Sequence, residues 1–308
     1  MQRNKTKGFY FAFATALVSG FSIFINKFAV VAIKEPLIFT ATRNTLVSLL
    51  LLAIIVFKKN FKELKKLSSK DFLFLVSIGI VGGSIPFYLF FTGLSQIPAI
   101  NGAIIHKTLV LWVTILAIPF LKEKLSKETF LVVFTLFFAN ILVGGFKGFE
   151  FSKGEFLVLV ATILWAVENV MAKKILSKVN PNLVIEARMG IGALILLTLS
   201  FILKPQALFS LGNLNATNWM WILITSLLLF SYVYFWYRGL KYLPAITATA
   251  VLTGSTLITN ILSAIFVTHT LNTLTLIQSA LIAIGIIALY KLELSLKETK
   301  NIKLETSY

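Results

Sequence analysis

The sequence predicts an all-α integral membrane protein with ten transmembrane helices, arranged as two inverted five-helix repeats. Three observations predict this fold class: the composition, the spacing of the apolar runs and an internal repeat. Of the 308 residues, 57% are hydrophobic, 13% are charged and 28 are Phe. One soluble core cannot bury that much apolar surface, so we expect the lipid bilayer to cover the rest.

Apolar runs long enough to cross a bilayer recur along the whole chain. A span needs about 20 mostly apolar residues, and charged residues or Pro, Gly and Asn separate the runs. The ten predicted spans are 8–32, 36–57, 71–95, 98–121, 128–145, 154–176, 181–203, 216–241, 244–267 and 272–294. The first run is longer than a signal-peptide core, so we interpret it as a retained span.

The basic residues predict that both termini are cytoplasmic. With the N-terminus inside, 21 of the 29 Lys and Arg residues fall in cytoplasmic segments, four in outside segments and four within spans. This asymmetry follows the positive-inside rule. It also accounts for the net charge of +17, so we expect no nucleic-acid partner. A lysine-rich chain whose only aspartate is Asp71 favours a bacterial inner (plasma) membrane.

The two halves of the chain match each other at an offset of 146 residues. Residues 91–100 align with residues 237–246, and Gly-Leu, Pro-Ala-Ile and the spacing between them recur. The predicted domains are a first repeat over 1–148, a second repeat over 149–294 and a cytoplasmic tail over 295–308. Because each repeat has five spans, the second copy enters the membrane from the opposite side.

An inverted repeat favours a secondary transporter. Its two halves can open a midplane site to each side of the membrane in turn. Duplication for bundle stability alone is the alternative interpretation. The sequence has no His-Glu-x-x-His, no Gly-x-Ser-x-Gly and no aspartate cluster, so we do not expect an enzyme. With no cysteine and two histidines we expect no metal and no cofactor, and no charge ring or filter loop indicates a channel.

Paired motifs recur in the same order in both halves. They are Pro36 and Arg43 with Pro181 and Arg188, Gly93-Leu94 to Pro98-Ala99 with Gly239-Leu240 to Pro244-Ala245, and Lys122-Glu123-Lys124 after the fourth span. In these motifs the chain resembles the EamA family of the drug/metabolite transporter superfamily over residues 8–294. The resemblance implies a central cavity lined mainly by spans 1 to 4 and 6 to 9. His269 departs from the acidic residue that the family often has there, matching Glu123.

The expected function is therefore transport of a small-molecule substrate by alternating access. Amino acids or related compounds, exported or exchanged, are the leading substrates. A nucleoside-containing metabolite such as S-adenosylmethionine is the second substrate class. A proton or a counter-substrate would drive transport. A non-transporting membrane receptor or scaffold is the alternative from a different class.

Charged side chains within spans are candidates for the site because each costs about 2.5 to 3.5 kcal/mol at the centre of a span. Glu168 has two interpretations: a substrate or proton role in the cavity, or a structural pair with Arg188, since both lie roughly 11 Å deep. Lys107, with His106 beside it, is a fixed cation near the midplane and favours an anionic or zwitterionic substrate. Arg43 is the repeat mate of Arg188, and we expect structural pairing for both.

Uncharged residues complete the predicted cavity lining. They are Asn169, Trp165, Tyr88, Ser22, Asn101 and Thr247. Ser22 is the repeat mate of Glu168, and Asn101 and Thr247 are mates in the small-residue starts of the fourth and ninth spans. The third span contains Gly82, Gly83 and Pro86, which predict a bend.

Overall fold

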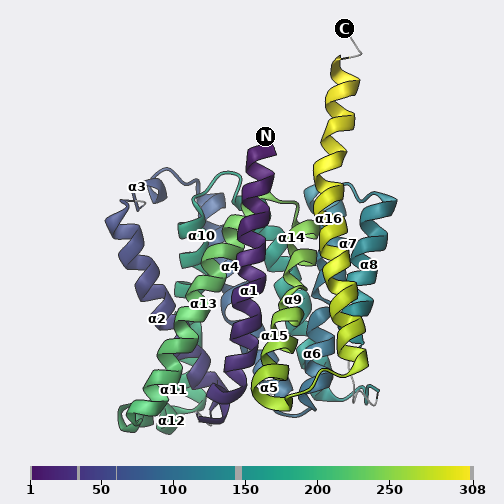
Figure 1. Ribbon diagram of the computed structural model, residues 1–308. Coiled ribbons are helices and arrows are strands. Elements are labelled where there is room, and N and C mark those ends of the chain that lie inside the picture. The colour runs from purple at the N-terminus through teal and green to yellow at the C-terminus, as the bar shows by residue number, and fades with distance from the viewer. Residues whose placement is uncertain (1, 33–34, 60, 143–147, 306–308) are drawn as a thin grey trace.

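The computed structural model describes residues 2–32, 35–59, 61–142 and 148–305. Within this part of the chain every regular element is a helix, and the helices pack side by side in one bundle (Figure 1). The N-terminus and the end of the last helix lie at the same face of the bundle (Figure 1), which we call the terminal face. The other end of the bundle is the opposite face.

The helices follow the predicted runs. The first half contains α1 (Gln2–Ala32), α2 (Pro36–Phe57), α3 (Phe61–Leu64), α4 (Ser69–Gly83), α5 (Ile85–Leu94), α6 (Ala99–Lys107), α7 (Leu109–Leu121) and α8 (Lys127–Ile141). The second half contains α9 (Lys153–Ile175), α10 (Pro181–Glu186), η1 (Ala187–Ile191), α11 (Gly192–Leu203), α12 (Pro205–Phe209), η2 (Ser210–Asn213), α13 (Ala216–Tyr242), α14 (Ala245–Leu252), α15 (Ser255–Ser263), η3 (Ala264–Thr268) and α16 (Thr273–Glu305). Several begin at a side-chain cap; Ser152, for example, forms a capping box with Glu155 at the start of α9.

Nine stretches of the described residues are helical, long and apolar enough to cross a bilayer. They correspond to nine of the ten predicted spans, and the predicted span 128–145 differs. There α8 has 15 residues, or about 22 Å at a rise of ~1.5 Å per residue, which is less than the ~30 Å hydrocarbon layer. Positions 143–145 of that predicted span lie outside the described residues.

Four of these nine spans are interrupted within the bundle, and they are numbered here as among the ten predicted spans. The third breaks at Ser84, between α4 and α5, where Pro86 follows and where the glycines predict a bend. The fourth breaks at Thr108, between α6 and α7, and the ninth between α14 and α15 at Gly254, its repeat mate. The seventh contains the π-helical turn η1. Breaks within a membrane are tolerated where protein or water satisfies the freed backbone groups, and they often frame binding sites.

Two glycines let the third span touch its neighbours at its break. A Cβ atom at Gly82 would overlap the side chain of Glu168, and one at Gly83 would overlap the carbonyl oxygen of Arg188. The Gly82 carbonyl accepts hydrogen bonds from Trp165 Nε1 at 3.1 Å and from Arg188 Nε at 3.3 Å. Side chains of α9 and η1 thus satisfy a carbonyl near the helix break.

Large buried side chains occupy the parts of α1 and α13 that are nearer the terminal face. Phe9, near the start of α1, is 2% exposed, and Trp236 and Tyr237, near the end of α13, are 1% and 0% exposed. These three residues belong to the main apolar core.

Candidate functional site

A cavity of about 290 Å³ lies at the level of the helix breaks. Its walls come from α1, α2, α5, α6, α7, α9, η1, α13, α14 and the start of α15. These elements belong to predicted spans 1 to 4 and 6 to 9, as the family resemblance implies. Three basic side chains line the cavity, and so do five aromatic ones: Arg43, Lys107 and Arg188, and Phe87, Phe90, Phe91, Trp165 and Tyr232.

Glu168 and Arg188 form a buried pair at the edge of this cavity. Glu168 is fully buried and does not line the cavity, whereas Arg188 is 7% exposed and does. One carboxylate oxygen of Glu168 accepts a hydrogen bond from the Tyr237 hydroxyl, and the other lies 3.8 Å from Arg188 Nη1. The structure therefore brings together the two residues whose equal depth predicts a pair. A substrate or proton role for Glu168 stays a prediction.

Lys107 occupies the last position of α6, at the helix break. Its ammonium group donates a hydrogen bond to Thr256 Oγ1 at 2.8 Å, and the Thr256 hydroxyl donates to Asn140 Oδ1 at 2.5 Å. Among the described residues, no carboxylate pairs with Lys107. Lys107 is therefore a cation held by neutral groups.

His106 stands between two aromatic rings of the cavity wall. Its ring centroid lies 5.4 Å from that of Phe90 and 5.1 Å from that of Trp165. Its Nδ1 atom is buried and has no hydrogen-bond partner within the described part of the chain. This arrangement leaves one buried polar atom unsatisfied beside an otherwise apolar part of the wall.

Arg43 lines the same cavity from α2. Its Nη2 atom donates to the Thr225 carbonyl at 3.3 Å, and its guanidinium lies 4.8 Å from the ring centroid of Phe39. Its Nε atom is buried without a hydrogen-bond partner among the described residues. Arg43 and Arg188 are repeat mates, yet in this part of the chain only Arg188 has a carboxylate beside it.

The remaining predicted site residues fall into two groups. Ser22, Asn169 and Trp165 line the cavity, and Asn169 accepts a hydrogen bond from Trp236 Nε1 at 3.0 Å. Tyr88 instead lines a second cavity of about 420 Å³ between α2, α5 and α11. Phe87, like Phe91, lines both cavities.

Asn101 and Thr247 lie away from the cavity lining, in the first turns of α6 and α14. Asn101 Nδ2 donates to Glu155 Oε1 at 2.7 Å, and Thr247 Oγ1 donates to Glu293 Oε1 at 2.7 Å. Both repeat mates thus bind a buried glutamate of another helix.

Three lining residues of α1 were not among the predicted ones: Ser19, Ile23 and Asn26, which accompany the predicted Ser22. Ser19, Ser22, Ile23 and Asn26 follow one another at helical spacing along the half of α1 that is remote from the terminal face. The spacing i, i+3, i+4, i+7 places them on one side of the helix. The sequence signal that could have identified these residues is a stripe of polar side chains along one side of an otherwise apolar helix.

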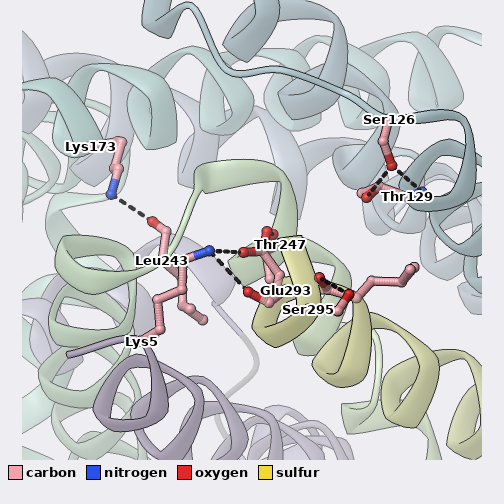
Figure 2. A network of polar contacts seen from close by, with 9 residues as sticks. Lys5, Ser126, Thr129, Lys173, Leu243, Thr247, Glu293 and Ser295 are labelled. Carbon is pink, nitrogen blue, oxygen red and sulfur yellow. Dashed lines mark hydrogen bonds and ion pairs between the residues drawn. The ribbon is translucent and has the colours of Figure 1, made fainter. Parts of the chain in front are cut away.

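A polar network closes the bundle at the terminal face. Lys5, in the first turns of α1, forms an ion pair with Glu293 of α16, and Glu293 also accepts the Thr247 hydroxyl (Figure 2). Lys173 of α9 donates to three carbonyls at the end of α13, including that of Leu243 at 2.6 Å (Figure 2). The network links helices of both halves of the chain.

Glu123 completes this network from the segment after α7. Its carboxylate accepts the backbone N–H groups of Ala245 at 2.6 Å and Ile246 at 3.1 Å, at the start of α14. An anion at a helix N-terminus and a cation at a C-terminus both stabilise the helix dipole. Burial raises the pKa of Glu123, although those two hydrogen bonds and the charge of Lys173 oppose the shift. We call Glu123, Lys173 and the α13–α14 corner that they cap the latch.

Known proteins are similar to this chain along most of its length. The model of the EamA-like transporter family matches residues 6–145 and again residues 152–291. The uncharacterized transporter YyaM of Bacillus subtilis (strain 168) is 28% identical over 245 residues, which are 74% of this chain and 78% of that protein. An uncharacterized transporter of Haemophilus influenzae is 27% identical over 187 residues, 58% of this chain and 60% of that one.

A protein of known crystal structure has the same fold. The two structures superpose with a TM-score of 0.76 at 15% sequence identity, covering 94% of this chain and 98% of the other. The double match of the family model agrees with an internal repeat, and the family consists of membrane transporters rather than enzymes. The chain belongs to the EamA-like transporter family.

Proposed function

We propose that this protein is a secondary transporter that moves small metabolites, amino acids or related compounds, by alternating access. It has ten spans, as two inverted five-helix repeats over 1–148 and 149–294 and a cytoplasmic tail over 295–308. Both termini are cytoplasmic in the bacterial inner membrane, and the protein exports or exchanges its substrate. A proton or a counter-substrate drives the cycle.

The observation that carries this proposal is a cavity at broken helices, with buried core side chains and the latch toward the terminal face. The cavity is lined by Lys107 and Thr253, which directly precede the breaks at Thr108 and Gly254 in the predicted fourth and ninth spans. Phe9, Trp236 and Tyr237 are buried in the parts of α1 and α13 nearer the terminal face, and the latch joins the α13–α14 corner to α9 and to the segment after α7. We infer that these contacts close the cavity toward the terminal face, as one state of an alternating-access cycle requires.

The cavity chemistry favours amino acids or related compounds over S-adenosylmethionine. Three basic side chains line the cavity, and Glu168, which pairs with Arg188, lies behind its wall. S-adenosylmethionine carries a sulfonium cation in addition to its amino-acid group, and that cation would meet uncompensated positive charge there, whereas a neutral amino acid adds no net positive charge.

Counterflow in proteoliposomes tests the proposal. Each compound of a panel of amino acids and metabolites is loaded inside, and entry of the labelled compound is followed at two pH values. The variants are Glu168→Gln and, as a matched control at an exposed acid, Glu128→Gln. We expect saturable counterflow of one compound, lost in Glu168→Gln and kept in Glu128→Gln. If folded wild-type protein moves no compound of the panel, the receptor or scaffold interpretation replaces this one.

A further inference from the structure

We propose that the cavity contains an anion subsite, to which the unpaired cations Arg43 and Lys107 of its lining supply positive charge, and that it takes a net-anionic small molecule with an apolar body. This inference rests on the proposed transport function and narrows its substrate class. It starts from the charges around the cavity.

Two of the three cavity cations have no charge partner. Arg188 has Glu168 at 3.8 Å, but no described carboxylate forms an ion pair with Arg43 or Lys107. Arg43 is 6% exposed, so its charge is largely removed from solvent. A buried charge is costly unless it is paired and hydrogen-bonded. A bound anion would supply the partner that the chain itself does not.

The two cations also keep free donors. Lys107 gives one hydrogen bond to Thr256 at 2.8 Å, and an ammonium group has further N–H donors. Arg43 gives one to the Thr225 carbonyl at 3.3 Å, and its Nε has no described partner. Guanidinium and ammonium donors to a carboxylate form short, strong, charge-assisted hydrogen bonds.

Unsatisfied polar atoms gather around this same space. In the described part of the chain, six buried side-chain N or O atoms lack a hydrogen-bond partner. Three of the six belong to residues that line the cavity: Asn26, Arg43 and His106. Unpaired buried atoms are rare in folded proteins, so their concentration here points to a polar ligand.

The aromatic side chains of the cavity wall favour a ligand whose uncharged part is apolar. His106 is flanked by Phe90 and Trp165, and Phe87 lies against Trp165 with ring centroids 5.3 Å apart. These rings provide an apolar surface in the same cavity lining as the two cations. The volume of about 290 Å³ lies just below the ~300–1,000 Å³ range of small-molecule sites. The site therefore fits a compact amphiphile with one anionic end.

Three compounds with one phenyl ring separate the charge classes: 3-phenylpropionate is an anion, phenylalanine a zwitterion and phenethylamine a cation. Calorimetry on the purified protein measures their affinities. The variants are Arg43→Gln, Lys107→Met and the charge-conserving Lys107→Arg, with Lys178→Met at a side chain that is 70% exposed as the control. A melting curve for each variant reports folding.

We expect 3-phenylpropionate to bind most tightly and phenethylamine least. Arg43→Gln and Lys107→Met weaken 3-phenylpropionate by about tenfold or more, the loss typical of a hydrogen bond to a charged group. Lys107→Arg retains the preference, and Lys178→Met changes nothing. The proposal is overturned if the wild-type protein fails to bind 3-phenylpropionate, binds phenethylamine as tightly, or keeps its affinity in both charge-removing variants.

The two proposals fail in distinguishable ways. Anion binding without counterflow would contradict the transporter proposal and support the anion subsite. If a compound shows counterflow and neither Arg43→Gln nor Lys107→Met alters its uptake, the result would support the transporter proposal and contradict the anion subsite.

Discussion

Replacing Glu168 by leucine removes the carboxylate that lies 3.8 Å from Arg188 Nη1 and accepts the Tyr237 hydroxyl. Leucine keeps much of the side-chain volume, so packing against Gly82 changes little. The effect is therefore electrostatic. It leaves Arg188, 7% exposed, with a positive charge that has no carboxylate beside it in the described structure.

The size of the effect follows from the burial of both partners. Removing one partner of a buried ion pair destabilises a protein by about 3–5 kcal/mol, because the other charge stays buried and uncompensated. Replacing both partners by apolar groups is often neutral. We therefore expect a loss of about 3–5 kcal/mol for Glu168→Leu, and a double variant Glu168→Leu with Arg188→Met that is more stable than Glu168→Leu alone.

Titration with a denaturing detergent measures the free energy of unfolding of the four proteins in this double-mutant cycle. A coupling energy of about 2 kcal/mol or more would agree with a direct pair. Two results would refute the reasoning: a Glu168→Leu protein within about 0.5 kcal/mol of wild type, or additive losses in the double variant.

Three further predictions concern the latch and a helix contact. Lys173→Met removes the donor to three carbonyls of α13, so a cysteine placed at Ser22 reacts faster with a thiol reagent from the terminal face; an unchanged rate would contradict the seal. The pKa of Glu123 is raised by burial in the sealed state. As pH falls from neutral toward its ordinary value of about 4.3, the cost of burying its charge disappears, so labelling from the terminal face slows, and Glu123→Gln abolishes this pH dependence. Gly83→Ala forces α4 away from the Arg188 carbonyl and lowers stability by about 1–3 kcal/mol, whereas Gly212→Ala, with open space around it, leaves the melting temperature unchanged.

Much of the helical pattern could be predicted because lipid imposes it locally. A run of about 20 apolar residues becomes a span whatever its neighbours are, and glycine and proline mark a break such as that at Ser84. The pairing of Glu168 with Arg188 was also predictable, since depth follows from counting residues at a fixed rise. The short α8 was not, because an apolar run does not reveal where a helix ends.

The contacts between the two halves could not be predicted from local patterns. Glu123 caps a helix that starts 122 residues later, and Lys173 caps one that ends 67 to 70 residues later. Arg43 was expected to pair structurally, like its mate Arg188, yet their surroundings differ because only the second repeat has Glu168, opposite Ser22 in the first. A repeat predicts equivalent backbones and not equivalent partners.

Two-sided labelling of one cavity residue tests the central claim most directly. The chain has no cysteine, so Ser22→Cys introduces a single thiol in the cavity lining, in the half of α1 remote from the terminal face. A membrane-impermeant thiol reagent is applied to intact cells and to inverted vesicles, with and without Lys173→Met. Alternating access with a sealed terminal face predicts faster labelling in intact cells, and a shift toward labelling in inverted vesicles when the latch is removed. Equal labelling from both sides in the unlatched and the latched protein would contradict it.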